Sequence, residues 1–160
     1  MESFTGSHRY VLDYLIEEVF QRQPAAVQDF LLKTSILDRF TAPLCDAVAE
    51  RDDSRDVLLA LEQSNLFIVP LDESRQWHRY HRLFADLLRQ QLRIAGMESL
   101  APELHRRASR WYEAAGHLAE AVQHALAASD WERAATLILD GSESTLKRGE
   151  VTTLFAVMAA

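Results

Sequence analysis

The sequence predicts a mainly α-helical protein that contains one β-hairpin. Apolar residues recur at helical spacing along most of the chain, and two short β-rich segments interrupt that pattern. The 160 residues include 5 glycines and 4 prolines, too few to favour an all-β sandwich or barrel with many tight turns. The apolar fraction of 48% and charged fraction of 26% are typical of a globular protein. We therefore expect helices packed around a hydrophobic core.

The first part of the chain is expected to form four short helices separated by turns. Apolar spacing that includes Val11 predicts an amphipathic helix over 9–21. Pro24 is suited to the first position of a second helix, because proline lacks an N–H that would go unused there. Thr41 and Ser54 are expected to cap the third and fourth helices, since hydroxyl side chains accept hydrogen bonds from free N–H groups.

The helical period is interrupted over 66–80. Residues 66–70 are rich in β-formers and end at a proline, and residues 75–80 alternate, which together predict a two-stranded hairpin. From His81 the apolar spacing is helical again as far as Gly96, an expected C-terminal cap. Three helices, a hairpin and a further helix are the element order of a winged helix. We assign this domain to 23–96.

The last third of the chain is expected to consist of helical pairs. Residues 97–102 are predicted to be a short linker, and a capping box at Ser129 is predicted to open a late helix. Small alanines at close-approach positions, with large Trp and Tyr residues opposite them, are typical of stacked helical pairs. About one and a half repeats are present, fewer than such arrays usually need, so we expect a fragment of a larger protein.

Charge and cysteine content limit the function classes. The net charge of −7 argues against nonspecific nucleic-acid binding by the whole chain, although 75–93 contains five arginines and two histidines against one acid. The single cysteine, Cys45, excludes a disulfide scaffold and a cysteine-cluster metal site. The chain has no long apolar run, and because residues 1–6 lack the basic and apolar regions of a secretory signal, none is expected. We expect a cytoplasmic protein with no membrane partner.

Several strings of the sequence resemble the MalT-like family of large bacterial transcriptional activators, which belong to the signal-transducing ATPases with numerous domains. The strings are GSHRYVLDYL (6–15), QDFLLKTSILDRFTAPLCDAV (28–48), LEQSNLFIVPLD (61–72), RYHRLFADLL (79–88) and LHRRASRWYEAAGHLAEAVQHALAASDWERAA (104–135). The resemblance implies a P-loop nucleotide-binding domain before the winged helix, tetratricopeptide-like repeats that bind an inducer after it, and a C-terminal LuxR-type helix-turn-helix that binds DNA.

The resemblance also assigns the segments of this chain. Residues 1–22 would be a helical connector after the nucleotide-binding domain, and 97–160 the start of a tetratricopeptide-like α-superhelix. The chain has no Gly-x-x-x-x-Gly-Lys-Ser/Thr string, so ADP, ATP and Mg²⁺ are expected to bind only the ATPase domain of the longer parent protein. No enzyme activity, cofactor or metal is expected for the fragment itself.

His81 is the first candidate for a binding residue. It lies where the hairpin is expected to lead into a helix, and a helix N-terminus attracts anions through its free N–H groups. The resemblance implies that the matching histidine contacts the β-phosphate of ADP and fastens the winged helix to the nucleotide domain. The family motif has Asp after this histidine, whereas Arg82 follows it here. The alternative is that His81 caps its own helix without a ligand.

Arg79 and Arg82 are weaker candidates on either side of His81. They could add charge at the phosphate or pair with acids of the nucleotide domain, and the alternative is that each is solvated. Trp77 and Tyr80 alternate with them and are expected to pack in the core or wing. His117, Glu120 and His124 share a helix face, but exposed polar residues are the better interpretation of that trio than a metal site.

These observations predict a regulatory clamp. In the ADP-bound state the winged helix and His81 would hold the nucleotide domain closed, and inducer binding at the repeats would release it. One alternative is a winged-helix DNA-binding module, although the acids of the fourth helix match or outnumber its bases. The other alternative is a helical-repeat scaffold that binds proteins through 103–160.

Overall fold

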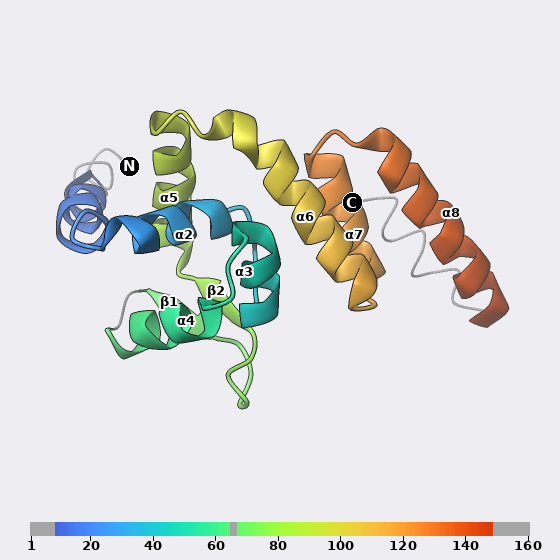
Figure 1. Ribbon diagram of the computed structural model, residues 1–160, viewed down its shortest axis with the longest axis horizontal. Coiled ribbons are helices and arrows are strands. Elements are labelled where there is room, and N and C mark those ends of the chain that lie inside the picture. Colours follow the sequence, from blue (N-terminus) through green and yellow to red (C-terminus); the bar gives the residue numbers. More distant parts are fainter. Residues whose placement is uncertain (1–8, 65–66, 149–160) are drawn as a thin grey trace, which may run out of the picture. The chain divides into compact units, whose positions relative to one another are not determined.

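The computed structural model describes residues 9–64 and 67–148. The chain divides into two compact units, an N-terminal unit that ends at Ser99 and a C-terminal unit that begins at Leu100. The described residues are mainly helical, and their one sheet is a two-stranded antiparallel hairpin in the N-terminal unit (Figure 1). The predicted fold class, a mainly α protein with a winged helix and one hairpin, is confirmed.

The N-terminal helix covers 9–20, and its second half, η1 (Leu15–Phe20), is a π-helix. The wider turn is closed by a bond from the Gln21 N–H to the Ile16 carbonyl, 2.8 Å long. Residues four and five positions apart therefore share the inner side, and Leu15, Val19 and Phe20 are buried. Val11, which ordinary helical spacing placed on the inner face, is 44% exposed.

Helices α2 (Ala25–Thr34) and α3 (Ala42–Ala49) follow. Pro24 is the residue before α2 rather than its first residue, one position earlier than predicted. Thr41 caps α3 as predicted, because its Oγ1 accepts the Leu44 N–H at 3.3 Å. Helix α3 ends at Glu50, whose φ of 53° lies in the left-handed region and reverses the chain.

Helix α4 (Ser54–Gln63) begins differently from the prediction. Ser54 is its first residue and not its cap, and its N–H donates to the Asp46 carboxylate at 3.0 Å. The preceding Asp53 does not cap the helix either, because both of its carboxylate oxygens accept hydrogen bonds from the Arg51 guanidinium, at 2.7 and 2.8 Å. The pKa of Asp53 is lowered, chiefly by this pair.

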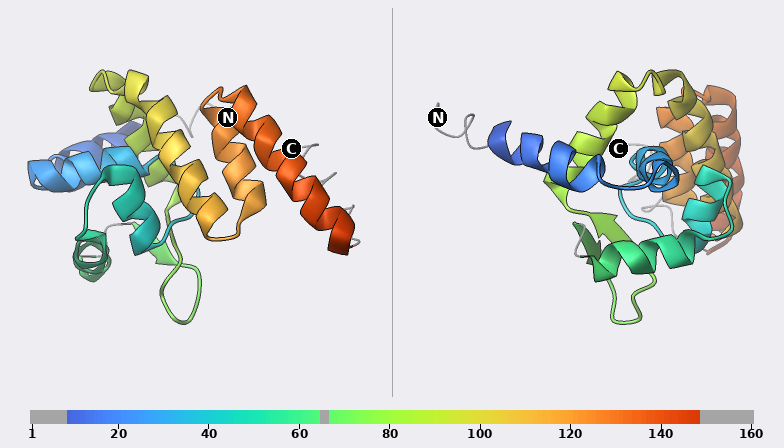
Figure 2. Two further views of the ribbon diagram at one scale, coloured as in Figure 1. Left: turned by 45° about the vertical axis from the view of Figure 1, so that its right-hand side comes forward. Right: turned by 60° about the vertical axis from the view of Figure 1, so that its left-hand side comes forward.

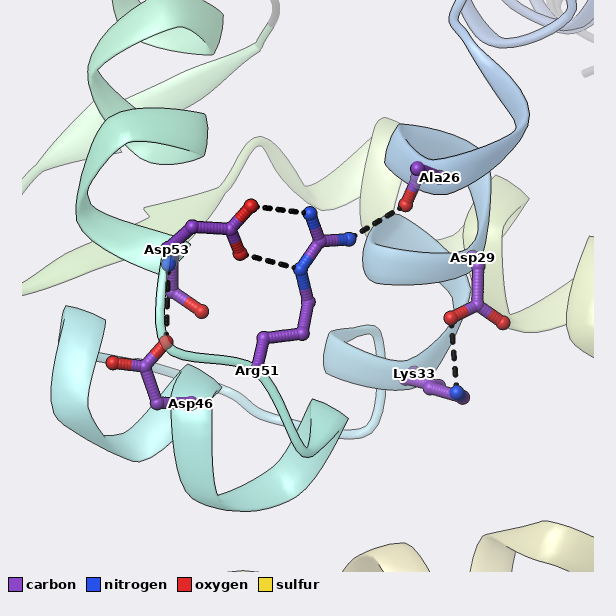
Figure 3. Close-up of polar contacts among 7 residues, drawn as sticks. Ala26, Asp29, Lys33, Asp46, Arg51 and Asp53 are labelled. Carbon is purple, nitrogen blue, oxygen red and sulfur yellow. Dashed lines mark hydrogen bonds and ion pairs between the residues drawn. The ribbon is translucent and has the colours of Figure 1, made fainter.

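Arg51 connects the turn before α4 to helix α2 (Figure 3). Its third nitrogen, Nη1, donates to the Ala26 carbonyl at 2.8 Å. The guanidinium carbon also lies 5.6 Å from the centre of the buried Phe30 ring. Arg51 thus links α2 to the α3–α4 turn, and the same network raises the pKa of Arg51, first through Asp53.

The hairpin consists of β1 (Ile68–Pro70) and β2 (His78–Tyr80), with Ile68 opposite Tyr80 and Pro70 opposite His78. Strand β1 ends at Pro70 as predicted, and residue 66 of its predicted segment lies outside the described residues. Strand β2 is shorter than its predicted segment, because Asp72 folds the residues before it into a turn. Its Oδ1 accepts the N–H groups of Gln76 and Trp77 at 2.9 and 3.0 Å. The loop from 71 to 77 extends away from the neighbouring helices (Figures 1 and 2).

Helix α5 (Arg82–Ile94) completes the N-terminal unit. Its buried side chains, Phe84, Leu87, Leu88 and Leu92, recur at helical spacing. The helix stops at Gly96, as predicted, where a φ of 72° suits a residue without a side chain. Tyr80 of β2 packs edge-on against Phe84, and its hydroxyl lies 2.6 Å from the Thr34 hydroxyl of α2. Helix α2, the hairpin and α5 therefore share one core.

The C-terminal unit contains α6 (Ala101–Ala114), α7 (Leu118–Ala127) and α8 (Trp131–Arg148). Helix α7 packs against both α6 and α8 (Figures 1 and 2). The expected linker over 97–102 is instead a 3-10 turn, η2 (Glu98–Leu100), and the start of α6, because Pro102 fits the first turn of a helix.

The interior of the C-terminal unit combines small alanines with a large aromatic side chain, as predicted. Ala108, Ala121 and Ala125 are fully buried, together with Tyr112 at 1% exposure. The predicted capping box is wrong in one detail: Asp130 rather than Ser129 caps α8, through the Arg133 N–H at 3.2 Å. Ser129 has a φ of 55°, in the left-handed region.

Candidate functional site

The alternation of strand β2 decides which side chains are available at its end. His78 and Tyr80 are buried, whereas Arg79 between them is exposed. His81 ends the strand, and its own N–H donates to the Phe67 carbonyl at 2.7 Å. The basic segment predicted from the sequence is therefore divided by the strand between the core and the surface.

His81 is the N-terminal cap of α5. Its Nδ1 accepts the Leu83 N–H at 3.4 Å, and its ring lies edge-on to Phe67, with the ring centres 6.2 Å apart. In a neutral imidazole one ring nitrogen accepts and the other carries the proton. The cap occupies Nδ1 as the acceptor and thereby directs the proton to Nε2. An exposed Nε2–H donor results at the positive end of a helix.

The surroundings of this helix end are favourable to an anion. The first turn of α5 has no acidic residue, and Arg82 adds a positive charge there. The predicted alternative, that His81 caps its own helix, is thus what the geometry shows. A cap and an anion contact use different ring nitrogens, so one does not prevent the other.

Arg79 and Arg82 line a hollow of about 360 Å³ beside the start of α5. The other lining residues are Leu37, Asp38, Tyr80, Ala85, Asp86 and Arg89. His81 is not among them, so the three candidates predicted from the sequence separate into a histidine at the helix end and two arginines in the hollow.

Sequence reasoning missed Arg89 as a component of this hollow. Its Nε donates to the Ser35 carbonyl at 2.9 Å, Nη2 lies 3.2 Å from Asp38 Oδ1, and Nη1 lies 3.9 Å from Asp86 Oδ1. The spacing from Arg82 through Asp86 to Arg89 on one helix was a usable signal, because these positions share a face. Asp38 comes from the turn after α2 and gave no such signal.

The other predicted side chains have structural surroundings. Tyr80 is a core residue at 4% exposure, and the Arg39 guanidinium lies 4.6 Å from the centre of the Trp77 ring. Cys45 is fully buried, which raises the pKa of its thiol well above the ordinary value. The packing expected for these three residues is observed.

The histidines of the C-terminal unit do not form the trio considered from the sequence. The Nδ1 atoms of His105 and His124 lie 2.9 Å apart. The Tyr112 ring stacks on the His124 ring, with ring centres 5.4 Å apart. Over the part of the chain that the structure describes, no group of three or more His, Cys, Asp or Glu residues is placed to hold a metal ion.

Helix α4, the position of a DNA-reading helix in winged-helix proteins, has a mixed surface. Arg55 and Asp56 are exposed together with Leu59, which is 53% exposed. Arg75 of the wing is held by Glu62 of α4 at 2.7 Å and is thereby neutralised. A surface that reads base edges would need more positive charge and fewer carboxylates.

Comparison with known proteins places this arrangement in a family. The MalT winged helix domain model matches residues 16–102. The serine/threonine-protein kinase PknK of Mycobacterium tuberculosis is 34% identical over 158 residues, which cover 99% of this chain and 14% of that protein. The HTH-type transcriptional regulator MalT of Vibrio cholerae is 34% identical over 153 residues, covering 95% of this chain and 17% of the regulator.

The MalT of Klebsiella pneumoniae is similar to the same degree, at 33% identity over 94% of this chain. The chain spans about one sixth of the length of these relatives. Within residues 9–64 and 67–148, no helix is both long enough and apolar enough to cross a bilayer. The family model covers the hairpin, His81 and the arginine-lined hollow alike, and the chain belongs to the MalT winged helix domain family.

Proposed function

We propose that this segment is the regulatory connection of a MalT-like transcriptional regulator, in which the winged helix clamps a nucleotide-binding domain. The segment matches relatives with two different named activities, a serine/threonine-protein kinase and a transcriptional regulator, over nearly its full length. A segment common to both supports a task that both share, such as control of an output located elsewhere in the longer chain.

The ligand proposed for the clamp is ADP bound to the parent's own P-loop domain, with Mg²⁺ and ATP in the active state. His81 would donate from Nε2 to a phosphate oxygen. The observation that carries this role is the cap itself, since Leu83 N–H occupies Nδ1 and leaves the donor nitrogen directed to an exposed, positive helix end. Arg82 in place of the family's Asp adds attraction for the phosphate.

The coupling follows from two states with different ligand preferences. ADP would favour the state in which the winged helix contacts the nucleotide domain, and an inducer at the downstream tetratricopeptide-like repeats would favour the released state. ATP exchange and self-association would then lead to transcription through a C-terminal helix-turn-helix. DNA is thus a partner of the parent and not of this winged helix.

The test measures the nucleotide that co-purifies with the full-length protein, by chromatography after denaturation. His81→Asn is the informative variant, because asparagine is a good helix cap but does not place a donor where the imidazole Nε2–H lies. We expect wild type to retain ADP and the His81→Asn protein to lose most of it while its circular dichroism spectrum is unchanged.

Arg93→Ala is the matched control, since Arg93 is an exposed basic residue near the other end of α5. It should retain ADP as wild type does. Equal ADP in wild type and His81→Asn would reduce His81 to a helix cap and overturn the clamp contact.

A further inference from the structure

We propose that the hollow lined by Arg79 and Arg82 binds a single carboxylate side chain on the surface of another protein domain. The inference concerns a different set of atoms from the His81 contact, because His81 does not line the hollow. It shares Arg82 with the nucleotide role proposed above, and the His81→Asn variant separates the two.

The first argument is that two guanidinium groups are available. Both Arg79 and Arg82 are exposed. Among the residues that the structure describes, Arg82 has no hydrogen bond or ion pair, and Arg79 makes a long bond of 3.5 Å to the Tyr80 carbonyl. The Tyr80 hydroxyl, which could compete for a ligand, is already paired with Thr34 at 2.6 Å. The two arginines are thus the donors that face a ligand.

The second argument is that Arg89 holds the remainder of the hollow in place. Its Nε is fixed by the Ser35 carbonyl, and its two other nitrogens face Asp38 and Asp86. Arg89 therefore offers little to a ligand and instead positions two carboxylates at the rim. The site is built by α5, by strand β2 and by the turn after α2, so it exists only in the folded unit.

The third argument is charge, which selects the class of ligand. Three arginines and two aspartates give the lining residues a net charge of +1. A single carboxylate balances that charge and matches the planar fork of a guanidinium. A phosphate dianion would exceed it and would approach Asp38 and Asp86. Asp38 pairs with Arg89 through Oδ1, but its side chain is 91% exposed and can also meet a cation beside the bound carboxylate, so the hollow fits a protein surface of paired charges.

The test is a titration of the ¹⁵N-labelled 160-residue protein, followed by the Nε–Hε signals of its arginines. The probe is glutamate blocked at both backbone ends, so that only the side-chain carboxylate is charged, and inorganic phosphate is titrated in parallel at equal ionic strength. We expect saturable shifts at Arg79 and Arg82 and none at Arg93. We expect the blocked glutamate to bind more tightly than phosphate.

Variants distinguish recognition by the planar guanidinium group from attraction to a positive charge alone. Arg82→Ala should weaken binding of the blocked glutamate at least threefold, and Arg82→Lys should weaken it less, because lysine keeps the charge but not the fork. Asp38→Asn, which raises the net charge of the hollow, should improve phosphate binding relative to glutamate. His81→Asn should leave the titration unchanged, which separates this outcome from that of the nucleotide test.

Two results would overturn the proposal. Shifts that are linear and equal at Arg79, Arg82 and Arg93 would show general ionic attraction without a site. Tighter binding of phosphate than of the blocked glutamate in the wild-type protein would identify a phosphate site instead.

Discussion

His78 is an unusual member of the core of the N-terminal unit. It is 5% exposed, and neither ring nitrogen has a hydrogen-bond partner among the residues that the structure describes. Glu62 Oε2 lies 3.7 Å from its Nε2, too far for a hydrogen bond. The ring instead stacks on Phe40, with centres 6.3 Å apart and planes inclined by 16°. His78 thus contributes aromatic packing at the cost of desolvating two polar atoms.

Replacement of His78 by phenylalanine should therefore stabilise the protein. The ring can keep its stacking on Phe40, and two unsatisfied buried nitrogens are removed, so the free energy of unfolding should rise by about 1 kcal/mol. Urea denaturation, monitored by circular dichroism, measures this free energy of unfolding. The matched control, Tyr80→Phe, removes a hydroxyl that is satisfied by Thr34 and should lower stability. A loss of stability in His78→Phe would show that Glu62 is a true partner of the imidazole.

Asp72 gives the wing loop a dependence on pH. Its pKa is lowered, first by the Ser74 hydroxyl and then by the backbone N–H groups of Trp77 and Gln76. A carboxylate with a lowered pKa stabilises the folded state above its unfolded pKa, and this contribution is lost as the pH falls from about 4 towards the folded pKa.

Asp72→Asn should thus melt at a lower temperature than wild type at pH 6, and the difference should shrink as the pH approaches 2.5. Thermal unfolding at several pH values measures the two curves. Glu73→Gln, an exposed change one residue away, is the control. The difference between its melting temperature and that of wild type should not shrink as the pH falls. A gap between wild type and Asp72→Asn that is constant with pH would contradict the role of the charge.

The helix ends show which local patterns are decided by their own residues. Thr41 and Gly96 act as predicted, because each cap depends on residues within a few positions in the sequence. The start of α4 could not be predicted in the same way. Ser54 is a good cap by type, but Asp46 from the preceding helix binds its N–H, and Arg51 removes Asp53 from competition. Such choices are made by contacts between elements.

Arg51 links α2 to the α3–α4 turn through hydrogen bonds to Ala26 and Asp53. Arg51→Ala should lower the free energy of unfolding by about 1–2 kcal/mol, a value limited by the partial exposure of Asp53. Arg51→Lys should lower it less, because lysine keeps a positive charge beside Asp53, but it should still destabilise, because one ammonium cannot form both the two bonds to Asp53 and the Ala26 bond. Urea denaturation measures both, with Arg55→Ala as the exposed control. Equal effects of Arg51→Ala and Arg55→Ala would contradict the assigned role.

The sequence pattern was sufficient for the order of elements and for part of the candidate site. The hairpin, α5 and the position of His81 at their junction follow from a change of period that is visible in the sequence. The hollow does not, because Asp38 and Arg89 are 51 positions apart and meet only after α2 and α5 pack. Periodicity predicts which face a residue occupies, and it does not predict which distant residue will face it.

The charge distribution of the chain leads to a prediction about DNA. The net charge is −7, the exposed surface of α4 is mixed, and Glu62 neutralises Arg75 in the wing. We expect no saturable binding of the 160-residue protein to a duplex of about 25 base pairs at physiological salt, measured by fluorescence anisotropy. Saturable binding that weakens with salt and with Arg55→Ala would instead support the DNA-reading alternative.

The hairpin is bonded at two places to residues of its unit that lie far from it in the sequence. The backbones of Phe40 and His78 exchange two hydrogen bonds of 2.8 Å, and the Tyr80 hydroxyl meets Thr34 on α2. These bonds oppose any motion of the two strands relative to the helices. A displacement imposed at His81 is therefore expected to move the hairpin, α2 and α5 together as one body, without a hinge between them.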